Sequence, residues 1–80
     1  RVNAISPGPM KTLSGAAIGG ARKTFRFTEA NTPLRANATK ASIGGTAVYL
    51  ASDYGECTTG ETIMVDGGLH ILGLPQPENF

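Results

Sequence analysis

The residues with the clearest capacity for chemistry lie in one short loop, Gly8-Pro9-Met10-Lys11-Thr12, which follows an apolar, strand-like segment. In open α/β sheets, ligands bind just beyond the carboxyl ends of the strands. Gly8 lets a flat ligand approach the backbone, Pro9 makes the loop rigid, and the N–H and C=O of Met10 suit a carboxamide. Thr12 stands at or near a helix start, where free N–H groups bind a phosphate. A nicotinamide dinucleotide carries both groups; an ordinary strand-to-helix loop is the alternative.

The other reactive side chains have simpler interpretations. Asp66 and His70 are four residues apart, but Asp66 precedes two glycines, where an aspartate accepts backbone N–H bonds in a turn. The chain has one cysteine, Cys57, so no internal disulfide is expected. With a single histidine besides, a zinc site of four Cys or His ligands is not expected, and no metal site is assigned. We interpret Cys57 as a bystander thiol, and Arg35 either as the partner of a carboxylate or as solvent-facing.

The elements around the loop are expected in the order strand, helices, strand. A strand over residues 2–6 is stopped by the following prolines, since proline has no ladder donor. A weak helix is expected over 12–20, where each of three glycines costs about 1 kcal/mol relative to alanine. A better helix follows over 21–30, with Phe25 as its apolar anchor and with exposed basic residues, namely Arg22, Lys23 and Arg26.

The second half of the chain completes the pattern. We expect a helix over 40–51, capped at or near Thr39, with an apolar stripe wide enough for burial on two sides. A β-branched segment over 61–65 predicts a strand that ends at Asp66-Gly67-Gly68, and an irregular tail follows. The order fits one crossover of a parallel sheet.

Length and charge limit the function classes. The chain has 80 residues and a formal net charge of +1. A chain of this length buries only about 60% of its unfolded surface, so we expect part of a domain, cut at least at an amino end that lacks methionine. The balanced charge argues against a nucleic-acid partner, which would need a basic patch. No apolar run approaches the ~20 residues of a membrane span. No signal peptide is visible.

The segment Asn3-Ala4-Ile5-Ser6-Pro7-Gly8, with Thr12 four residues on, resembles the nicotinamide loop of short-chain dehydrogenases/reductases. The continuation Gly8-Pro9-Met10-Lys11-Thr12-Leu13 is similar, more narrowly, to bacterial enoyl-acyl-carrier-protein reductases. The similarity covers nearly the whole chain in order, through Pro33-Leu34-Arg35, Tyr49-Leu50-Ala51-Ser52-Asp53, and the stretch from Thr59 to Gly68.

This resemblance implies an α/β fold, namely the carboxy-terminal part of a Rossmann-type doubly wound parallel sheet. The chain would supply two strands with intervening lid and crossover helices. Residues 1–80 then divide into the strand and nicotinamide loop (1–12), lid helices (13–30), a helix (39–52), the last strand (61–66) and the tail (69–80).

The resemblance also implies NADH as the cofactor and an enoyl-acyl carrier protein as the substrate, whose trans-2 double bond is reduced in fatty acid synthesis. A cytoplasmic homotetramer is expected. The cofactor-binding residues would be Gly8, Pro9, Met10, Lys11, Thr12, Leu13 and Ser14, and the acyl-binding residues would be Ala16, Ala17 and Ile18.

Catalytic residues are not assigned. The family uses a tyrosine and a lysine spaced Tyr-x-x-x-Lys, and neither Tyr49 nor Tyr54 is followed by lysine at that spacing. The glycine-rich dinucleotide fingerprint is absent as well. Both motifs lie upstream of the matched segment in the family.

Two alternatives remain open. Pro7 stands where many enoyl reductases have alanine and where carbonyl-reducing relatives have proline, which favours a carbonyl-reducing short-chain dehydrogenase/reductase. The short length and the missing motifs favour a non-catalytic truncated subunit. The choice between NADH and NADPH is not encoded in these residues.

Overall fold

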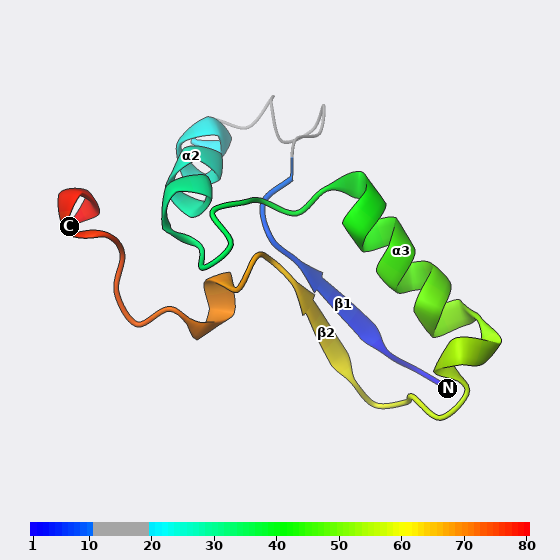
Figure 1. Ribbon diagram of the computed structural model, residues 1–80. Coiled ribbons are helices and arrows are strands. Elements are labelled where there is room, and N and C mark those ends of the chain that lie inside the picture. The colour runs from blue at the N-terminus through cyan, green and yellow to red at the C-terminus, as the bar shows by residue number, and fades with distance from the viewer. Residues whose placement is uncertain (11–19) are drawn as a thin grey trace.

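The computed structural model describes residues 1–10 and 20–80, with the side chain of residue 21 excluded, and contains two parallel strands with helices beside them (Figure 1). Strand β1 (Ala4–Pro7) pairs with β2 (Thr62–Val65), with Ala4 opposite Thr62 and Pro7 opposite Val65. Helix α3 (Lys40–Ala51) runs beside the strands, and α2 (Ala21–Asn31) lies beyond their carboxyl ends. The predicted α/β class and the single parallel crossover are confirmed.

The predicted end of the first strand is wrong by one residue, because Pro7 lies inside β1. The N–H groups of Ala4 and Gly8 donate toward the other strand, to Glu61 O at 2.8 Å and Val65 O at 2.9 Å. In a parallel ladder alternate residues donate to the same neighbour, so the nitrogen of Pro7 faces away from β2. The missing donor of the proline therefore costs no bond in this pair.

The amino ends of the strands are joined by side chains. The Asn3 Nδ2 donates to Thr58 O at 3.0 Å, and Asn3 Oδ1 accepts from the N–H of Glu61 at 3.0 Å. The Thr59 hydroxyl accepts from the N–H of Val2 at 3.0 Å. These bonds set the register of β1 against β2 before the ladder begins, and they join residues too distant in the sequence to be predicted from it.

Helix α3 confirms the predicted helix and its cap. Thr39 Oγ1 accepts from the N–H of Ser42 at 3.0 Å, and Ser42 Oγ accepts from the N–H of Thr39 at 3.0 Å. This reciprocal pair is a capping box in which serine takes the place usually held by glutamate or glutamine. No residue of α3 is buried by the described parts of the chain, and Val48 is 68% exposed.

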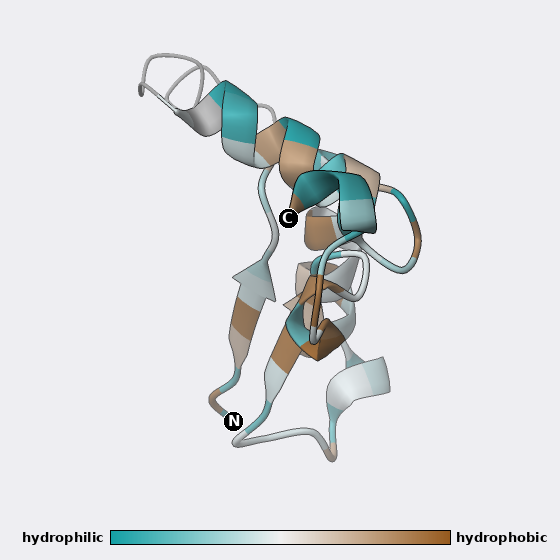
Figure 2. Cartoon of the chain, turned by 90° about the vertical axis from the view of Figure 1, so that its left-hand side faces the viewer, coloured by the Kyte–Doolittle hydropathy of each residue, from teal (hydrophilic) through white to brown (hydrophobic). Residues whose placement is uncertain are grey.

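Helix α2 extends one residue beyond the prediction, to Asn31. It begins after Gly20, which has a φ of 90°. Phe25 is half-buried, as expected for the apolar anchor, and the predicted exposure of the basic residues is confirmed for Arg22, Lys23 and Arg26. Figure 2 shows hydrophilic residues at the start of α2 and hydrophobic residues on both strands. The weak helix expected over 12–20 falls largely outside the described residues.

The most deeply buried side chains are polar. Asn31 is 2% exposed and Thr32 is fully buried, whereas Ala38 is the one buried apolar residue within the described parts of the chain. Both polar residues lie where α2 meets the turn that follows β2, residues 66–68. We call this segment the Asp66–Gly68 turn. The centre of packing is therefore a hydrogen-bonded junction.

The Asp66–Gly68 turn requires its glycines. Gly67 has a φ of 67°, and a methyl group there would lie 2.5 Å from Ala36 O. Gly68 has a φ of 93°, and a methyl group there would lie 2.8 Å from Pro33 Cγ. The turn thus brings the loop after α2 against the end of β2, and the Leu34 N–H donates to Gly67 O at 3.1 Å.

The substitution Gly67→Ala should destabilise the intact protein more than Gly60→Ala. Gly60 also has a positive φ, 73°, but open space surrounds it. Gly60→Ala should therefore lose about 1–2 kcal/mol from the left-handed backbone alone. Gly67→Ala adds a backbone clash and should lose roughly 3–4 kcal/mol in the free energy of unfolding. Urea denaturation measures both, and equal losses would show that the close approach of Ala36 is not a constraint.

Candidate functional site

The predicted nicotinamide loop leaves the carboxyl end of β1 directly beside the Asp66–Gly68 turn. A methyl group on Gly8 would lie 3.0 Å from the Asp66 Cα and 3.1 Å from its Cβ. From the sequence, Gly8 was expected to let a ligand approach the backbone. The structure adds a different reason, since the backbone of Asp66 already occupies the space that a side chain would need. Glycine lets the two strand ends converge at the edge where parallel sheets bind ligands.

The structure describes three of the predicted cofactor-binding residues, Gly8, Pro9 and Met10. Each lies at the expected end of β1. The other predicted cofactor-binding residues, Lys11, Thr12, Leu13 and Ser14, lie outside the described residues. So do the predicted acyl-binding residues, Ala16, Ala17 and Ile18.

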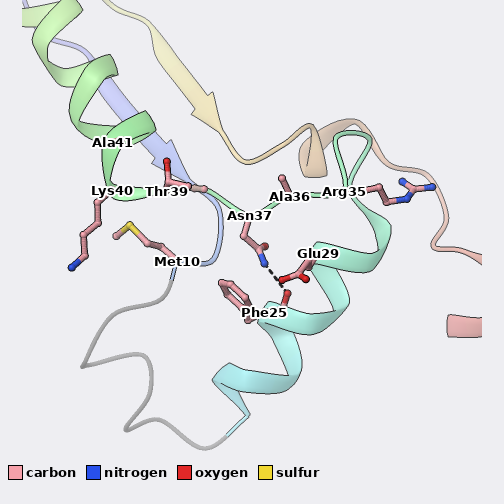
Figure 3. Close-up of a pocket in the computed structure, with 10 residues that line it drawn as sticks. Met10, Phe25, Glu29, Arg35, Ala36, Asn37, Thr39, Lys40 and Ala41 are labelled. Atoms are coloured by element: carbon pink, nitrogen blue, oxygen red, sulfur yellow. Dashed lines mark hydrogen bonds between the residues drawn. The ribbon is translucent and has the colours of Figure 1, made fainter.

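Met10 lies at a cavity of about 650 Å³ (Figure 3). Phe25 and Glu29 of α2 form the facing wall, and residues 35–41 complete the lining. The lining combines apolar residues with polar ones, including Glu29 and Asn37. Such a mixture is typical of sites for small organic ligands. The cavity therefore joins the predicted cofactor loop to the predicted lid helix.

Asn37 holds α2 in place as the wall of this cavity. Its Nδ2 donates to Phe25 O at 2.9 Å, the bond drawn in Figure 3. Its Oδ1 accepts a short hydrogen bond from the Thr28 hydroxyl. One loop residue thus binds the helix at two successive turns, although nothing in its local sequence distinguishes it from an ordinary loop asparagine.

Asp66 confirms the expectation that it accepts backbone N–H bonds in its turn. It is 7% exposed, and its carboxylate accepts from the N–H of Gly68 at 2.9 Å and of His70 at 3.2 Å. The His70 Nδ1 lies 2.9 Å from Oδ2. Burial alone would raise the pKa of Asp66. The net effect is a pKa below the ordinary value, because the carboxylate is stabilised by the Gly68 N–H, by the ring and N–H of His70, and by the charge of His70.

Arg35 is exposed, as the solvent-facing interpretation expects, and its guanidinium bonds to backbone carbonyls. Its guanidinium donates to the backbone carbonyls of Thr32, at 2.5 Å, and Asn31, at 3.4 Å. Arg35 itself has a φ of 52°. The side chain therefore closes the end of α2 by satisfying carbonyls that the helix leaves open. A positive φ lets it fold back in this way, which sequence spacing alone does not indicate.

Over residues 1–10 and 20–80 there is no cluster of three His, Cys, Asp or Glu side chains suited to a metal ion. Within the same residues, none of the helices has the length and apolar character needed to cross a bilayer. A second cavity of about 500 Å³ lies between β1 and α3, lined by Arg1, Asn3 and Ile5 among others. It is at the amino end of β1, away from the loop.

A family model described as enoyl-(acyl carrier protein) reductase matches residues 1–70. The chain is 49% identical over 73 residues to the enoyl-[acyl-carrier-protein] reductase [NADH] FabI of Bacillus cereus, covering 91% of this chain and 28% of that protein. It is 44% identical over 72 residues to the corresponding [NADPH] enzyme of Staphylococcus aureus, covering 90% and 28%.

A crystal structure of the enoyl-(acyl-carrier-protein) reductase of Anaplasma phagocytophilum in complex with NAD has a similar fold. It superposes with a TM-score of 0.84 at 41% identity, over 98% of this chain and 27% of that one. The chain therefore spans less than a third of the length of these relatives. The Rossmann-type fold class inferred from the sequence is confirmed.

The carboxylate of Asp66 should stabilise the intact protein in a pH-dependent way. Because its folded-state pKa lies below the ordinary value of 3.8, its contribution is present above that pH and is lost as pH falls through the lower folded pKa. Asp66→Asn should cost about 1–3 kcal/mol at pH 7. The cost should shrink toward pH 3. Urea midpoints at both pH values measure this, and a pH-independent cost would contradict it.

Proposed function

Because the chain belongs to the enoyl-(acyl carrier protein) reductase family, we propose that it is the carboxy-terminal part of an enzyme that reduces the trans-2 double bond of enoyl thioesters. The donor would be NADH and the substrate would be carried on acyl carrier protein. The observation that carries this proposal is the loop from Gly8 to Met10 at the carboxyl end of β1, beside a cavity formed with α2. Relatives named as enoyl reductases share 44–49% of the aligned residues.

The loop would bind the nicotinamide end of the cofactor. The backbone N–H and C=O of Met10 would pair with the carboxamide, and the Thr12 hydroxyl would bind a phosphate oxygen. Their neighbours Gly8, Pro9, Lys11, Leu13 and Ser14 would complete the contact surface. The packing of Gly8 against Asp66 supports this role, because a loop fixed to a neighbouring turn presents its backbone groups in one direction.

The acyl chain would bind beside the cofactor loop, on the side that faces α2. Ala16, Ala17 and Ile18 would line its path, and α2 would cover it. The cavity between Met10 and Phe25 supports this proposal, since it places an aromatic side chain across from the cofactor loop.

This chain would bind and orient the reactants rather than supply the acid. NADH, when bound, would supply the hydride that reduces the enoyl double bond at its β-carbon. The tyrosines and the lysine that stabilise the resulting enolate in the family would lie upstream, in the part of the longer protein that precedes this segment. The role of the present residues is to hold the nicotinamide ring at a fixed angle and distance from the substrate, which is a large part of the catalytic effect in such reactions.

A cytoplasmic homotetramer is part of the proposal. The support is α3, which has no residue buried by the described parts of the chain. A helix that is apolar on most of its surface is expected to be covered on more than one side. The rest of the protein would cover one side and a second copy would cover another.

The proposal is tested by following NADH oxidation in the intact protein with a trans-2-enoyl thioester. Reduction of the enoyl thioester, without reduction of a 3-ketoacyl thioester, is the expected result. The opposite preference would favour the carbonyl-reducing alternative that Pro7 suggests. Substituting NADPH for NADH in the same assay decides the cofactor, since the relatives include enzymes named for each.

Thr12→Ala should raise the KM for NADH roughly tenfold, because it removes one hydrogen bond to a charged phosphate. Thr12→Ser keeps the hydroxyl and should leave the KM within about twofold, the scatter of a change that leaves the bond in place. An unchanged KM in the alanine variant would remove this residue from the cofactor site.

A further inference from the structure

Asn31 is the last residue of α2, and its side chain is 2% exposed. Both the nitrogen and the oxygen of its side-chain amide form hydrogen bonds. The Nδ2 donates to Phe27 O at 2.8 Å, one turn back in the helix. The Oδ1 accepts from the backbone N–H of Gln76 at 2.6 Å, 45 residues away in the sequence. A single buried side chain thus joins the end of α2 to the tail.

The tail is attached at two places: the N–H groups of Leu69 and Ile71 bond to the Asp66–Gly68 turn, and the N–H of Gln76 bonds to Asn31. It extends from the Asp66–Gly68 turn and returns beside the end of α2 (Figure 1). Near the end of the chain, the bonds from the N–H of Asn79 to Gln76 O and from the N–H of Phe80 to Pro77 O stay within the last turn of the tail. They shape the tail without attaching it to the helix. Ile71, Leu74 and Phe80 are mostly exposed, so apolar packing of these side chains adds little to the attachment.

The same helix forms one wall of the cavity beside Met10. Phe25 and Glu29 lie on α2, and Asn37 binds the helix at its middle. Asn31 binds it at the carboxyl end. Thr32 also holds this end, but it bonds to the loop that directly follows the helix, so Asn31 adds an attachment to a segment distant in the sequence.

We propose that Asn31 is a positioning residue for the acyl substrate. By binding residue 76 and its own helix at once, it fixes α2 against the tail and so sets the wall of the cavity across from the cofactor loop. This role rests on the proposed function. Asparagine suits it because the two bonds need a donor and an acceptor on one short side chain; aspartate has no donor and leucine has neither.

The sharpest test changes the partner rather than the asparagine. Gln76 has φ −60° and ψ 148°, values that proline adopts without strain. Gln76→Pro therefore removes the N–H donor and places a ring against Asn31 Oδ1. The matched control, Gln76→Ala, removes the same side chain and keeps the donor. Asn31→Asp is a second variant, which keeps the acceptor and loses the bond to Phe27 O.

In the intact protein, Gln76→Pro should raise the KM for the enoyl thioester fivefold to tenfold, the factor expected for roughly one lost hydrogen bond. The KM for NADH should stay within about twofold, since Met10 and its neighbours are untouched. Gln76→Ala should leave both constants unchanged. Asn31→Asp keeps the acceptor for the N–H of residue 76 and loses only the bond to Phe27 O, so it should raise the KM for the enoyl thioester less than Gln76→Pro does. Equal changes in both KM values would indicate general loosening and would overturn the positioning role.

Amide hydrogen exchange supplies a readout that does not depend on activity. Exchange in the last turn of α2, residues 27–31, should rise in Gln76→Pro and not in Gln76→Ala. Unchanged exchange would overturn the attachment itself. Faster exchange with an unchanged KM for the thioester would overturn the link to the substrate. If the unmutated protein reduced no enoyl thioester, the proposed function and the substrate role would fall, and the exchange result would still decide the attachment.

Discussion

The close packing of backbone around the Asp66–Gly68 turn is the constraint on which the rest of the structure depends. Gly8 at the end of β1 contacts Asp66, while Gly67 lies against Ala36 and Gly68 against Pro33. None of these approaches leaves room for a Cβ atom without a shift of its neighbour. The buried Asp66 carboxylate holds the turn from within by accepting two backbone N–H bonds. Three segments distant in the sequence therefore meet at one point, and the cofactor loop starts there.

Hydrogen bonds rather than apolar burial define this meeting point. Asn31 and Thr32 are the most buried side chains, and both use their polar atoms fully, on α2, on the following loop and on the tail. Directional bonds of this kind fix geometry more narrowly than contacts between apolar side chains. The apolar surface of α3 remains open in the described residues. In the proposed full-length enzyme, the remaining chain would supply most of the hydrophobic stabilisation, while this segment would supply the shape of the site.

Features encoded by neighbouring residues could be predicted from the sequence, and features encoded by distant ones could not. The cap of α3 at Thr39 and the turn after β2 follow from local chemistry, so both were foreseen. Pro7 was misplaced because the direction of its nitrogen depends on the partner strand. The exposure of Arg35 was among the expectations, but its bonds to the end of α2 were not, because they accompany a positive φ that the sequence does not indicate. The role of Asn31 could not be predicted from the sequence, since the N–H group that it binds lies 45 residues further along the chain.

The central claim is that the loop at the end of β1 binds the nicotinamide of the cofactor. A crystal structure of the intact protein with NAD⁺ bound tests it most directly. The account predicts that the carboxamide lies within hydrogen-bonding distance of the Met10 backbone, with the ring over the cavity that faces Phe25. A dinucleotide bound at another edge of the sheet, with no contact to residues 8–10, would contradict it.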